Sequence, residues 1–522
     1  MLALGLAVFY LLVIIAPLVS PTHIAIYHLN GSIYSIVLPV FLNLTVVWLL
    51  LAGLLLLAQR PGKLRILVWS TLILTMPWVL LKNYAVLTQK STLHKLSLIV
   101  FSLTLIALLL LWFLWKPKFL PPFERVQRLA MMMIAFASLS GLFVVGQLIR
   151  FTWQARNLNQ PRPLHQRQFT SATRVPKKRI VWLVLDELSY EQVYERRFPG
   201  LQLPAFDQLA AQSSVFTQTV PVAVKTEIVI PSLMTGIKTD QITASADGQL
   251  ALHNAVTNRW QPFDAHQTVF EDALDSGYST AIDGWFNPYC RILAAVSDHC
   301  FWSSYVSFLG PALYVDGSVL GNFLKPAHLL FDTALSYLSG HGHTDPDKRL
   351  GAQLHIEDYK DISTAADRLL ADSSTNFFFL HIPVPHPEGI YSRETSRMTD
   401  DGNSSYIDNL ALADQYLAHL HFLLEQRSEW DSTTIVVMGD HSWRTTLFWQ
   451  PSLVWTPEDE AASHGGQFDD RPAYIVKLPN QQQGSRIDDR FDAVRTRALL
   501  DGIIADRIKT PEDLAAWVRQ GK

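Results

Sequence analysis

Long apolar runs dominate the first 150 residues of this chain. They cover residues 2–20, 34–58, 64–86, 96–115 and 129–148, each close to the ~20 residues that a helix needs to cross a bilayer. The pattern therefore predicts a transmembrane domain of about five helices over residues 1–149. The first run could also be a signal peptide. Its apolar stretch is long and no basic segment precedes it, however, so a retained helix is favoured.

The pattern changes beyond residue 149. Residues 150–179 are rich in Arg, Gln and Pro and lack apolar periodicity, which is typical of a basic juxtamembrane linker. From residue 180 onward, short strand-like runs alternate with helical stretches, which predicts an α/β domain with a largely parallel sheet over residues 180–522, ending in a C-terminal helix. The strand-like runs are residues 180–185, 377–382, 434–438 and 473–478, and a long helical stretch covers 406–426.

Charge alone leaves the orientation of the transmembrane domain open. A basic cluster around Arg60 and Lys63 would be cytoplasmic if the amino terminus is inside, which would place the large domain outside. Lys90 and Arg156 would then lie on the outer side, so the comparison of basic loops is close to a tie. The first 150 residues contain a single acidic residue, Glu124.

The chain has two cysteines, Cys290 and Cys300, in one short stretch of the large domain. This spacing favours a disulfide formed in an oxidising compartment, although two unrelated buried thiols would show the same pattern.

Acidic and imidazole side chains follow two of the predicted strands. Asp186 and Glu187 come directly after 180–185, and Asp440 and His441 follow 434–438. Parallel strands place their site residues at their carboxyl ends, so these side chains are expected to meet. An Asp-Glu pair after a strand is more often a cap or a solvated pair, whereas the Gly-Asp-His sequence is a stronger signal. Together they predict a site for one divalent metal ion, zinc or manganese.

A candidate nucleophile lies between the two acidic motifs. Thr226 precedes Gly236 by ten positions in the stretch Lys225 to Gly236, and an ordinary helix cap is the alternative explanation for a lone Thr. This stretch resembles the alkaline phosphatase and sulfatase superfamily, in which a Cys or Ser that becomes formylglycine precedes a Thr-Gly pair. Thr cannot become formylglycine, so this chemistry is disfavoured. With Pro231 five positions later, the segment instead resembles that of bacterial phosphoethanolamine transferases.

This resemblance implies an architecture as well as a nucleophile. Phosphoethanolamine transferases and the related lipoteichoic acid synthases carry five membrane helices before an extracytoplasmic catalytic domain. The resemblance therefore implies a multi-pass protein of the plasma (inner) membrane, with its catalytic domain on the periplasmic side. The expected fold of that domain is a three-layer sandwich around a largely parallel sheet.

Three histidines are further candidates. His381 and His386 lie where a predicted strand runs into a loop, and this segment resembles the paired-His loop of the transferases. The resemblance implies that His386 contacts the phosphoryl or leaving group. For His381, a structural histidine at a strand end is an equally good explanation. Two-zinc members of the superfamily have Asp where Ile382 stands here, which favours one catalytic metal. His464 precedes an Arg-Pro strand, as a late histidine of the superfamily often does, but its His-Gly-Gly sequence is also typical of a turn.

Charged neighbours complete the predicted site. Lys225 and Arg444 are each close in sequence to a site residue and could neutralise phosphate oxygens, although surface cations are usually solvated. Glu187 is either a second carboxylate ligand or a group that orients the ligands.

The predicted function is a metal-dependent transfer of a phosphoethanolamine- or phosphoglycerol-type group from a phospholipid to an envelope glycan or lipid, through a phosphothreonine at Thr226. A membrane-tethered hydrolase of phosphate or sulfate esters is the first alternative. A non-catalytic binding or sensing module of the same fold is the second, and the filled ligand and nucleophile positions argue against it. No nucleic-acid partner is expected.

Overall fold

The computed structural model describes residues 1–60, 62–88, 96, 99–100, 102–103, 106–107, 110, 120–165, 177–305, 318–324, 344–452 and 454–521. The chain forms two compact units. The membrane unit consists of Met1–Ile26, Gly31–Leu158 and Leu309–Phe331. The second unit consists of Tyr27–Asn30, Asn159–Phe308 and Asp332–Lys522, and we call it the catalytic unit because the sequence predicts the site residues there. The second unit thus includes a short segment from the amino-terminal region of the sequence.

Three described helices of the membrane unit are long and apolar enough to span a bilayer. A fourth span is formed if the bent pair α1 and α2, which meet at an angle of 83°, counts as one. The prediction of five is therefore not confirmed: the first predicted run is bent, and more than half of the run 96–115 lies outside the described residues. The helices are α1 (Leu2–Tyr10), α2 (Leu12–Val19), α3 (Ile24–Tyr27), α4 (Tyr34–Leu57), α5 (Lys63–Thr88) and α7 (Leu120–Ala155).

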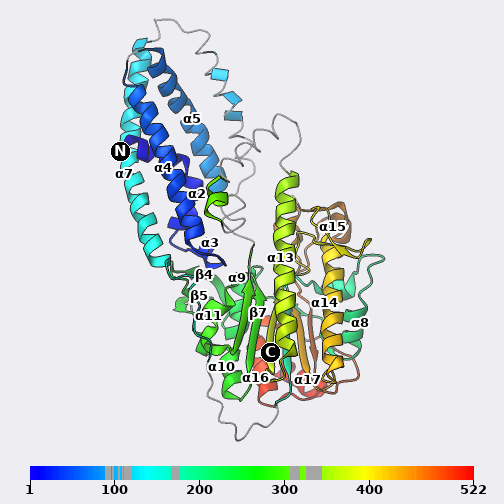
Figure 1. The fold of residues 1–522 in the computed structure, drawn as a ribbon. Helices are drawn as coiled ribbons and strands as arrows, with labels where there is room; N and C mark the ends of the chain where they lie inside the picture. Colours follow the sequence, from blue (N-terminus) through cyan, green and yellow to red (C-terminus); the bar gives the residue numbers. More distant parts are fainter. Residues whose placement is uncertain are drawn as a thin grey trace. The chain divides into compact units, whose positions relative to one another are not determined.

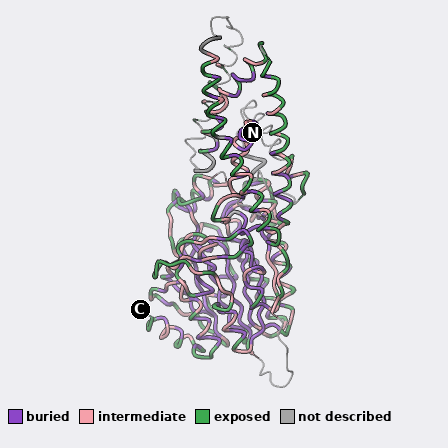
Figure 2. The backbone as a smooth tube through the Cα atoms, turned by 90° about the vertical axis from the view of Figure 1, so that its left-hand side faces the viewer, coloured by how far each residue is buried: buried purple, intermediate pink, exposed green. Residues whose placement is uncertain are grey.

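Small residues bring α1 and α7 into backbone contact. A Cβ atom on Gly5 would lie 2.6 Å from Ser138 Cα, and one on Gly141 would lie 2.9 Å from Gly5 Cα. Such close approach is how helices associate in a bilayer, where burial of apolar surface gives little driving force. The outward faces of the spans remain apolar, as the exposed Phe136 illustrates. Figure 2 shows this contrast between the exposed surfaces of the long helices and the buried interior of the catalytic unit.

An eight-stranded sheet forms the centre of the catalytic unit (Figure 1). Seven strands run parallel, and β13 runs antiparallel to both of its neighbours. In sheet order the strands are β14 (Ser485–Ile487), β2 (Ser214–Phe216), β13 (Tyr474–Lys477), β12 (Thr434–Gly439), β1 (Ile180–Leu185), β9 (Phe377–Ile382), β7 (Thr280–Trp285) and β8 (His299–Ser303). A separate antiparallel sheet contains β4 (Thr239–Ala244), β5 (Leu250–Asn254) and β6 (Arg259–Pro262).

Helices cover both faces of the large sheet. Alternate residues of β1 face opposite sides: Leu183 belongs to one apolar core and Trp182 to the other, and every residue of the strand is buried. The first core is closed by α8 (Pro204–Ala211), α13 (Thr344–Ala371) and α14 (Tyr406–Gln426). The second is closed by α9 (Thr226–Thr235), α10 (Val269–Asp275), α16 (Thr496–Ile504) and α17 (Pro511–Gln520). The predicted three-layer arrangement with its C-terminal helix is confirmed.

The register of the central strands determines where the site forms. Leu185 at the end of β1 is paired with Gly439 of β12 on one side and with Ile382 of β9 on the other. The residues that follow these three strands therefore emerge side by side at one edge of the sheet.

Candidate active site

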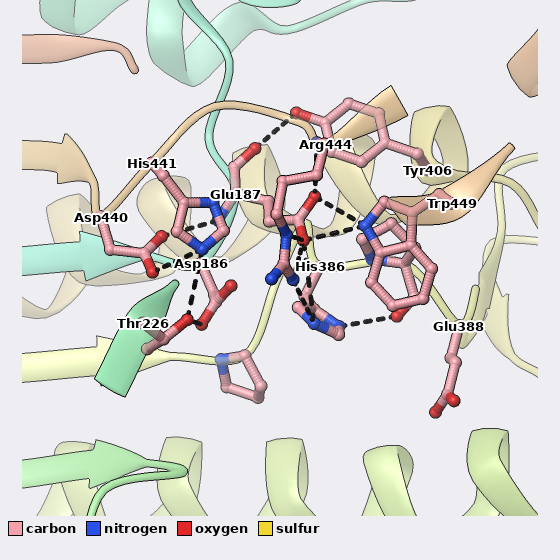
Figure 3. A network of polar contacts seen from close by, with 12 residues as sticks. Asp186, Glu187, Thr226, His386, Glu388, Tyr406, Asp440, His441, Arg444 and Trp449 are labelled. Atoms are coloured by element: carbon pink, nitrogen blue, oxygen red, sulfur yellow. Dashed lines mark hydrogen bonds and ion pairs between the residues drawn. The ribbon is translucent and has the colours of Figure 1, made fainter. Parts of the chain in front are cut away.

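Five buried side chains converge at this edge, and we call them the open cluster. Figure 3 shows Asp186, Thr226, Asp440 and His441 of this cluster. The hydroxyl of Thr226 donates to Asp186 Oδ2 at 3.3 Å and lies 3.3 Å from His441 Nε2. His441 Nε2 lies 3.2 Å from Asp440 Oδ2, and His381 Nε2 lies 3.2 Å from Asp186 Oδ2. The sequence-predicted residues Asp186, Thr226, Asp440 and His441 are thus brought together, and His381 joins them.

Local backbone features place these side chains. Thr226 is the first residue of the ten-residue helix α9, so its hydroxyl lies at the amino-terminal, positive end of the helix dipole. Gly439 precedes Asp440 because a Cβ atom there would lie 2.6 Å from the Leu188 carbonyl oxygen. The turn that presents the Asp-His pair therefore has no room for a side chain at position 439.

The open cluster contains buried polar atoms that no described residue satisfies. Asp186 Oδ1, Asp440 Oδ2 and His381 Nε2 are buried without a hydrogen-bond partner. Burial raises the pKa of Asp186 well above its ordinary range, and the charges of Asp440 and Glu187 raise it further. Orphaned buried groups of this kind are costly unless a ligand completes them.

The two imidazoles of the open cluster are held neutral with one nitrogen free. Burial lowers the pKa of His381 to about 4 and, together with Arg444, lowers that of His441 to about 3. His441 Nδ1 lies 3.1 Å from the Ser442 carbonyl oxygen and donates to it, which leaves the Nε2 lone pair free. One ligand atom each from Asp186, His381 and Asp440 lie within 4.8 Å of one another. Carboxylates with neutral imidazoles suit a divalent cation, so the donor set fits a metal ion.

Glu187 is the centre of a second group of buried side chains, the closed cluster. Arg444 Nε donates to Glu187 Oε1 at 2.6 Å and its backbone N–H to Oε2 at 3.1 Å. Trp449 Nε1 lies 2.9 Å and 3.0 Å from the same two oxygens. Tyr406 donates to the Glu187 carbonyl oxygen at 2.8 Å. With both oxygens occupied by these donors, Glu187 is placed to orient its neighbours; it still lies close enough to Asp186 and His386 to share a ligand with them.

The backbone of Glu187 links the two clusters. Its φ of 64° lies in the left-handed region, which is unfavourable for a residue with a side chain. The strain aims its N–H at Asp440 Oδ1, 3.0 Å away. Consecutive residues, Asp186 and Glu187, thereby face different clusters.

His386 also belongs to the closed cluster. Its Nδ1 donates to the Pro387 carbonyl oxygen at 2.7 Å, and its Nε2 accepts from Arg444 at 3.3 Å. The ring lies edge-on to Trp285 and Trp449, with centroid distances of 4.9 Å and 5.0 Å. Burial and the nearby Arg444 charge lower the pKa of His386 well below its ordinary value. His386 is therefore a neutral acceptor facing the site.

Two predicted residues are not brought into either cluster. The side chain of His464 is exposed in the turn after α15 (Pro457–Ala462), and no contact among the described residues joins it to the site. Its φ of 51° agrees with the turn that its Gly-rich surroundings also indicated. Lys225 is exposed as the N-cap of α9, with its side chain making no described contact to the site.

The disulfide predicted between Cys290 and Cys300 is formed, with an S–S distance of 2.06 Å, and it joins α11 (Tyr289–Ile292) to β8. The adjacent Tyr289 hydroxyl lies 2.7 Å from His381 Nδ1. Gly284 makes room for this contact, since a Cβ atom there would lie 2.4 Å from the Tyr289 ring. Sequence reasoning missed Tyr289, because the link between α11 and β9 exists only after folding.

Arg291 in α11 fixes a distant segment to the same turn. It is 5% exposed, and its guanidinium donates to the Tyr27 carbonyl oxygen at 2.6 Å and to that of Leu29 at 2.9 Å. His28 Nδ1 lies 2.8 Å from the Phe286 carbonyl oxygen. These bonds explain why Tyr27–Asn30 belongs to the catalytic unit.

A model of the sulfatase family matches residues 178–474. No curated protein sequence matches the chain. Similar solved structures include Ps i-CgsB with k-i-k-neocarrahexaose (15% identity, 65% of this chain and 74% of that chain, TM-score 0.40). They also include the phosphonate monoester hydrolase of Agrobacterium radiobacter (12%, 63% and 74%, 0.37) and the lipoteichoic acid synthase LtaP from Listeria monocytogenes (13%, 68% and 79%, 0.35). The family match covers more than half of the chain and includes Asp186, Thr226 and Asp440, so the chain belongs to the sulfatase family.

Proposed function

We propose that this chain is a membrane-bound phosphotransferase that moves a phosphoethanolamine- or phosphoglycerol-type group from a phospholipid to an envelope glycan or lipid. The transfer passes through a phosphothreonine at Thr226. The observation that carries the proposal is the position of the Thr226 hydroxyl, 3.3 Å from both Asp186 Oδ2 and His441 Nε2 in a cluster with orphaned ligand atoms.

The nucleophile favours phosphoryl chemistry over sulfate-ester hydrolysis. Formylglycine requires Cys or Ser, and position 226 is Thr. An unmodified hydroxyl can form a phosphodiester and pass the phosphoryl-linked group to a second alcohol. The amino terminus of α9 favours negative charge beside Thr226, which suits an incoming phosphodiester.

Asp186, Asp440, His441 and His381 are the residues that would hold a divalent cation. Bound there, it would favour the alkoxide of Thr226 and offset charge on the phosphoryl oxygens. Thr226 Oγ1 forms a bond to phosphorus while the bond from phosphorus to the departing lipid alcohol breaks. The proton that Thr226 loses ends on that alcohol. In the second half, an acceptor hydroxyl displaces Thr226, which regains a proton.

Residues of the closed cluster have two roles: they accept the proton of the acceptor hydroxyl and stabilise charge on the phosphoryl oxygens. His386 Nε2 accepts from Arg444 at 3.3 Å in the folded protein, and it takes the proton of the incoming hydroxyl when the substrate displaces that contact. Arg444, held by Glu187, stays charged at the border of the two clusters and can stabilise charge on the phosphoryl oxygens.

A lipid donor fits the surroundings of the site. The short π-helical segment Thr445–Trp449 follows Arg444 and exposes two large apolar side chains, Leu447 at 54% and Phe448 at 53%. Arg444 lies over the Phe448 ring at 5.1 Å, so this apolar surface adjoins the closed cluster. Such exposure suits contact with acyl chains. The spans of the membrane unit further support a donor taken from the bilayer, with the catalytic unit outside the plasma (inner) membrane, where a disulfide persists.

The test is the intact mass of the full-length protein after incubation with phosphatidylethanolamine or phosphatidylglycerol vesicles and zinc or manganese. We expect a metal-dependent adduct whose mass identifies the transferred group. The adduct should be absent from Thr226→Ala, retained in part by Thr226→Ser, and unchanged in Thr235→Ala, which alters the other end of α9.

Each other outcome points to a different function. Lipid turnover without a transferable adduct, with the alcohol released into water, would identify a hydrolase that uses the same residues. An adduct that persists in Thr226→Ala would exclude Thr226 as the nucleophile. If the protein shows no lipid turnover and binds no metal, a non-catalytic module is favoured.

A further inference from the structure

A groove in the membrane unit combines an apolar wall with a polar end. It has a volume of about 430 Å³ and lies between the carboxyl-terminal part of α7 and the chain that follows α2. This is the size of pockets that hold small organic ligands. The two helices are in contact, and both are visible in Figure 1.

The α7 wall changes character along the helix. Phe143 and Val144 form its apolar part, and Gln147, Arg150 and Gln154, with Phe151 among them, form its more polar part. The three polar residues are spaced by three and four positions, so they lie on one face of the helix. Phe143 and Arg150 are separated by about 10 Å along the axis. That distance resembles the step from the acyl chains of a lipid to its headgroup.

The opposite wall adds a second polar group at the same level. His23 stacks on Phe151, with ring centroids 5.4 Å apart, and both residues line the groove. His23 Nδ1 is buried and has no hydrogen-bond partner among the described residues. It is available to a ligand in the groove.

The charge of Arg150 has no described counterpart. Glu124 is the one acidic residue in the described part of the membrane unit, and it faces Arg65 across 3.9 Å. Glu124 also lies about 39 Å from Arg150 along α7. A cation beside an apolar wall, at the end of a membrane span, is best neutralised by a group that carries both an anion and hydrocarbon.

We infer that this groove binds one phospholipid molecule, with its phosphate at Arg150 and His23 and an acyl chain along Phe143 and Val144. The inference depends on membrane attachment and is independent of the chemistry at Thr226. The phospholipid in the groove would be a lipid that stays bound to the membrane unit, distinct from the lipid that reacts.

The experiment measures the phospholipid that stays with the full-length protein after prolonged washing in detergent, by lipid extraction and native mass spectrometry. We expect about one retained phospholipid per chain. Arg150→Gln should lower retention about tenfold, since it removes a charged hydrogen-bond donor. Val144→Trp, which fills the apolar wall, should lower it as well.

Matched variants separate the groove from general lipid association. Arg156→Gln removes a charge from the same end of α7, but Arg156 lies over the Trp153 ring at 4.0 Å and does not line the groove. Arg156→Gln and Thr226→Ala should retain lipid like the unaltered protein. Equal retention in all variants would overturn the inference. A second outcome would also overturn it. If Arg150→Gln weakens binding of inorganic phosphate while Val144→Trp retains its phospholipid, the groove binds an anion and not a phospholipid.

Discussion

The open and closed clusters lie beside each other at the ends of β1 and β12, yet they differ in whether their buried carboxylate oxygens have hydrogen-bond donors. In the open cluster, Asp186 and Asp440 bring like charges together and leave oxygens without partners. In the closed cluster, Glu187 receives donors from Arg444 and Trp449 on both oxygens. One group is incomplete without a ligand, and the other is complete as folded.

This difference indicates that the open cluster binds the reacting groups and that the closed cluster holds the site in place. An uncompensated carboxylate pair is costly in a folded protein and persists where a cation or substrate completes it. A saturated carboxylate instead holds its neighbours in place, as Glu187 holds Arg444 against His386. The same substitution of carboxylate by amide should therefore have different consequences in the two clusters.

The largest expected effect follows Asp186→Asn. Loss of this ligand should remove stoichiometric metal and lower turnover by about 10⁴-fold, the scale seen when a central catalytic group is deleted. The fold should be kept, because the metal-free cluster loses a like-charge contact and gains none. Metal analysis, lipid turnover and a melting curve of the full-length protein check this. A variant that keeps one metal per chain would remove Asp186 from the ligand set.

Glu187→Gln should act mainly on stability. It leaves Arg444, whose side chain is 13% exposed, without its charge partner, and breaking a buried pair costs about 3 kcal/mol or more. Metal affinity should change by a few-fold at most. Because Trp449 donates to Glu187, tryptophan fluorescence during denaturation can follow the loss.

Glu458→Gln provides the matched control for that variant. Its partner Arg393 and Glu458 itself are 27% and 29% exposed, so their pairing contributes no more than about 1 kcal/mol. Equal destabilisation by both substitutions would contradict the view that the closed cluster supports the site. Loss of metal in Glu187→Gln would place Glu187 among the ligands.

Much of the open cluster was predictable from sequence because its residues lie at strand ends. The apolar runs before Asp186 and Asp440 predict buried parallel strands, and parallel strands align their carboxyl ends. Thr226 needed a resemblance, since a lone Thr before a helix is usually a cap. The antiparallel direction of β13 was not predictable, because strand direction depends on the connection and not on the apolar pattern.

The supporting residues could not be predicted for a common physical reason. Tyr289, Tyr406 and Trp449 reach the site from elements far apart in sequence, and their contacts depend on packing between layers. His464 shows the converse, since a motif position suggested a site residue and the structure places it in an exposed turn. Local sequence predicts where a strand ends better than which side chains pack against that end.

Removal of the metal should destabilise the protein through the open cluster alone. A ligand that binds only the folded state adds about 2.7 kcal/mol of stability at a free concentration of about 100 Kd. A chelator should therefore lower the melting temperature of the full-length protein, and Asp186→Asn should be insensitive to it. Glu187→Gln, starting from lower stability, should show the same sensitivity as the unaltered protein. If the chelator does not change the melting temperature of the unaltered protein, metal binding by the open cluster is contradicted.

The smallest effect is expected from Tyr289→Phe, which tests how the open cluster is held in place. The hydroxyl lies 2.7 Å from His381 Nδ1, and its loss removes one of the contacts that hold the ring, leaving the backbone hydrogen bond with Trp285. Metal affinity should fall about 10-fold, as is typical when a partner of a ligand is removed. Titration of the metal-free protein checks this without requiring turnover. The control is Tyr278→Phe, which removes a hydroxyl from a ring that packs against Phe377 in the same core, and it should keep full affinity. If Tyr289→Phe also keeps full affinity, the Tyr289 hydroxyl does not position His381, and the open cluster depends on its neighbours for position less than the closed cluster does.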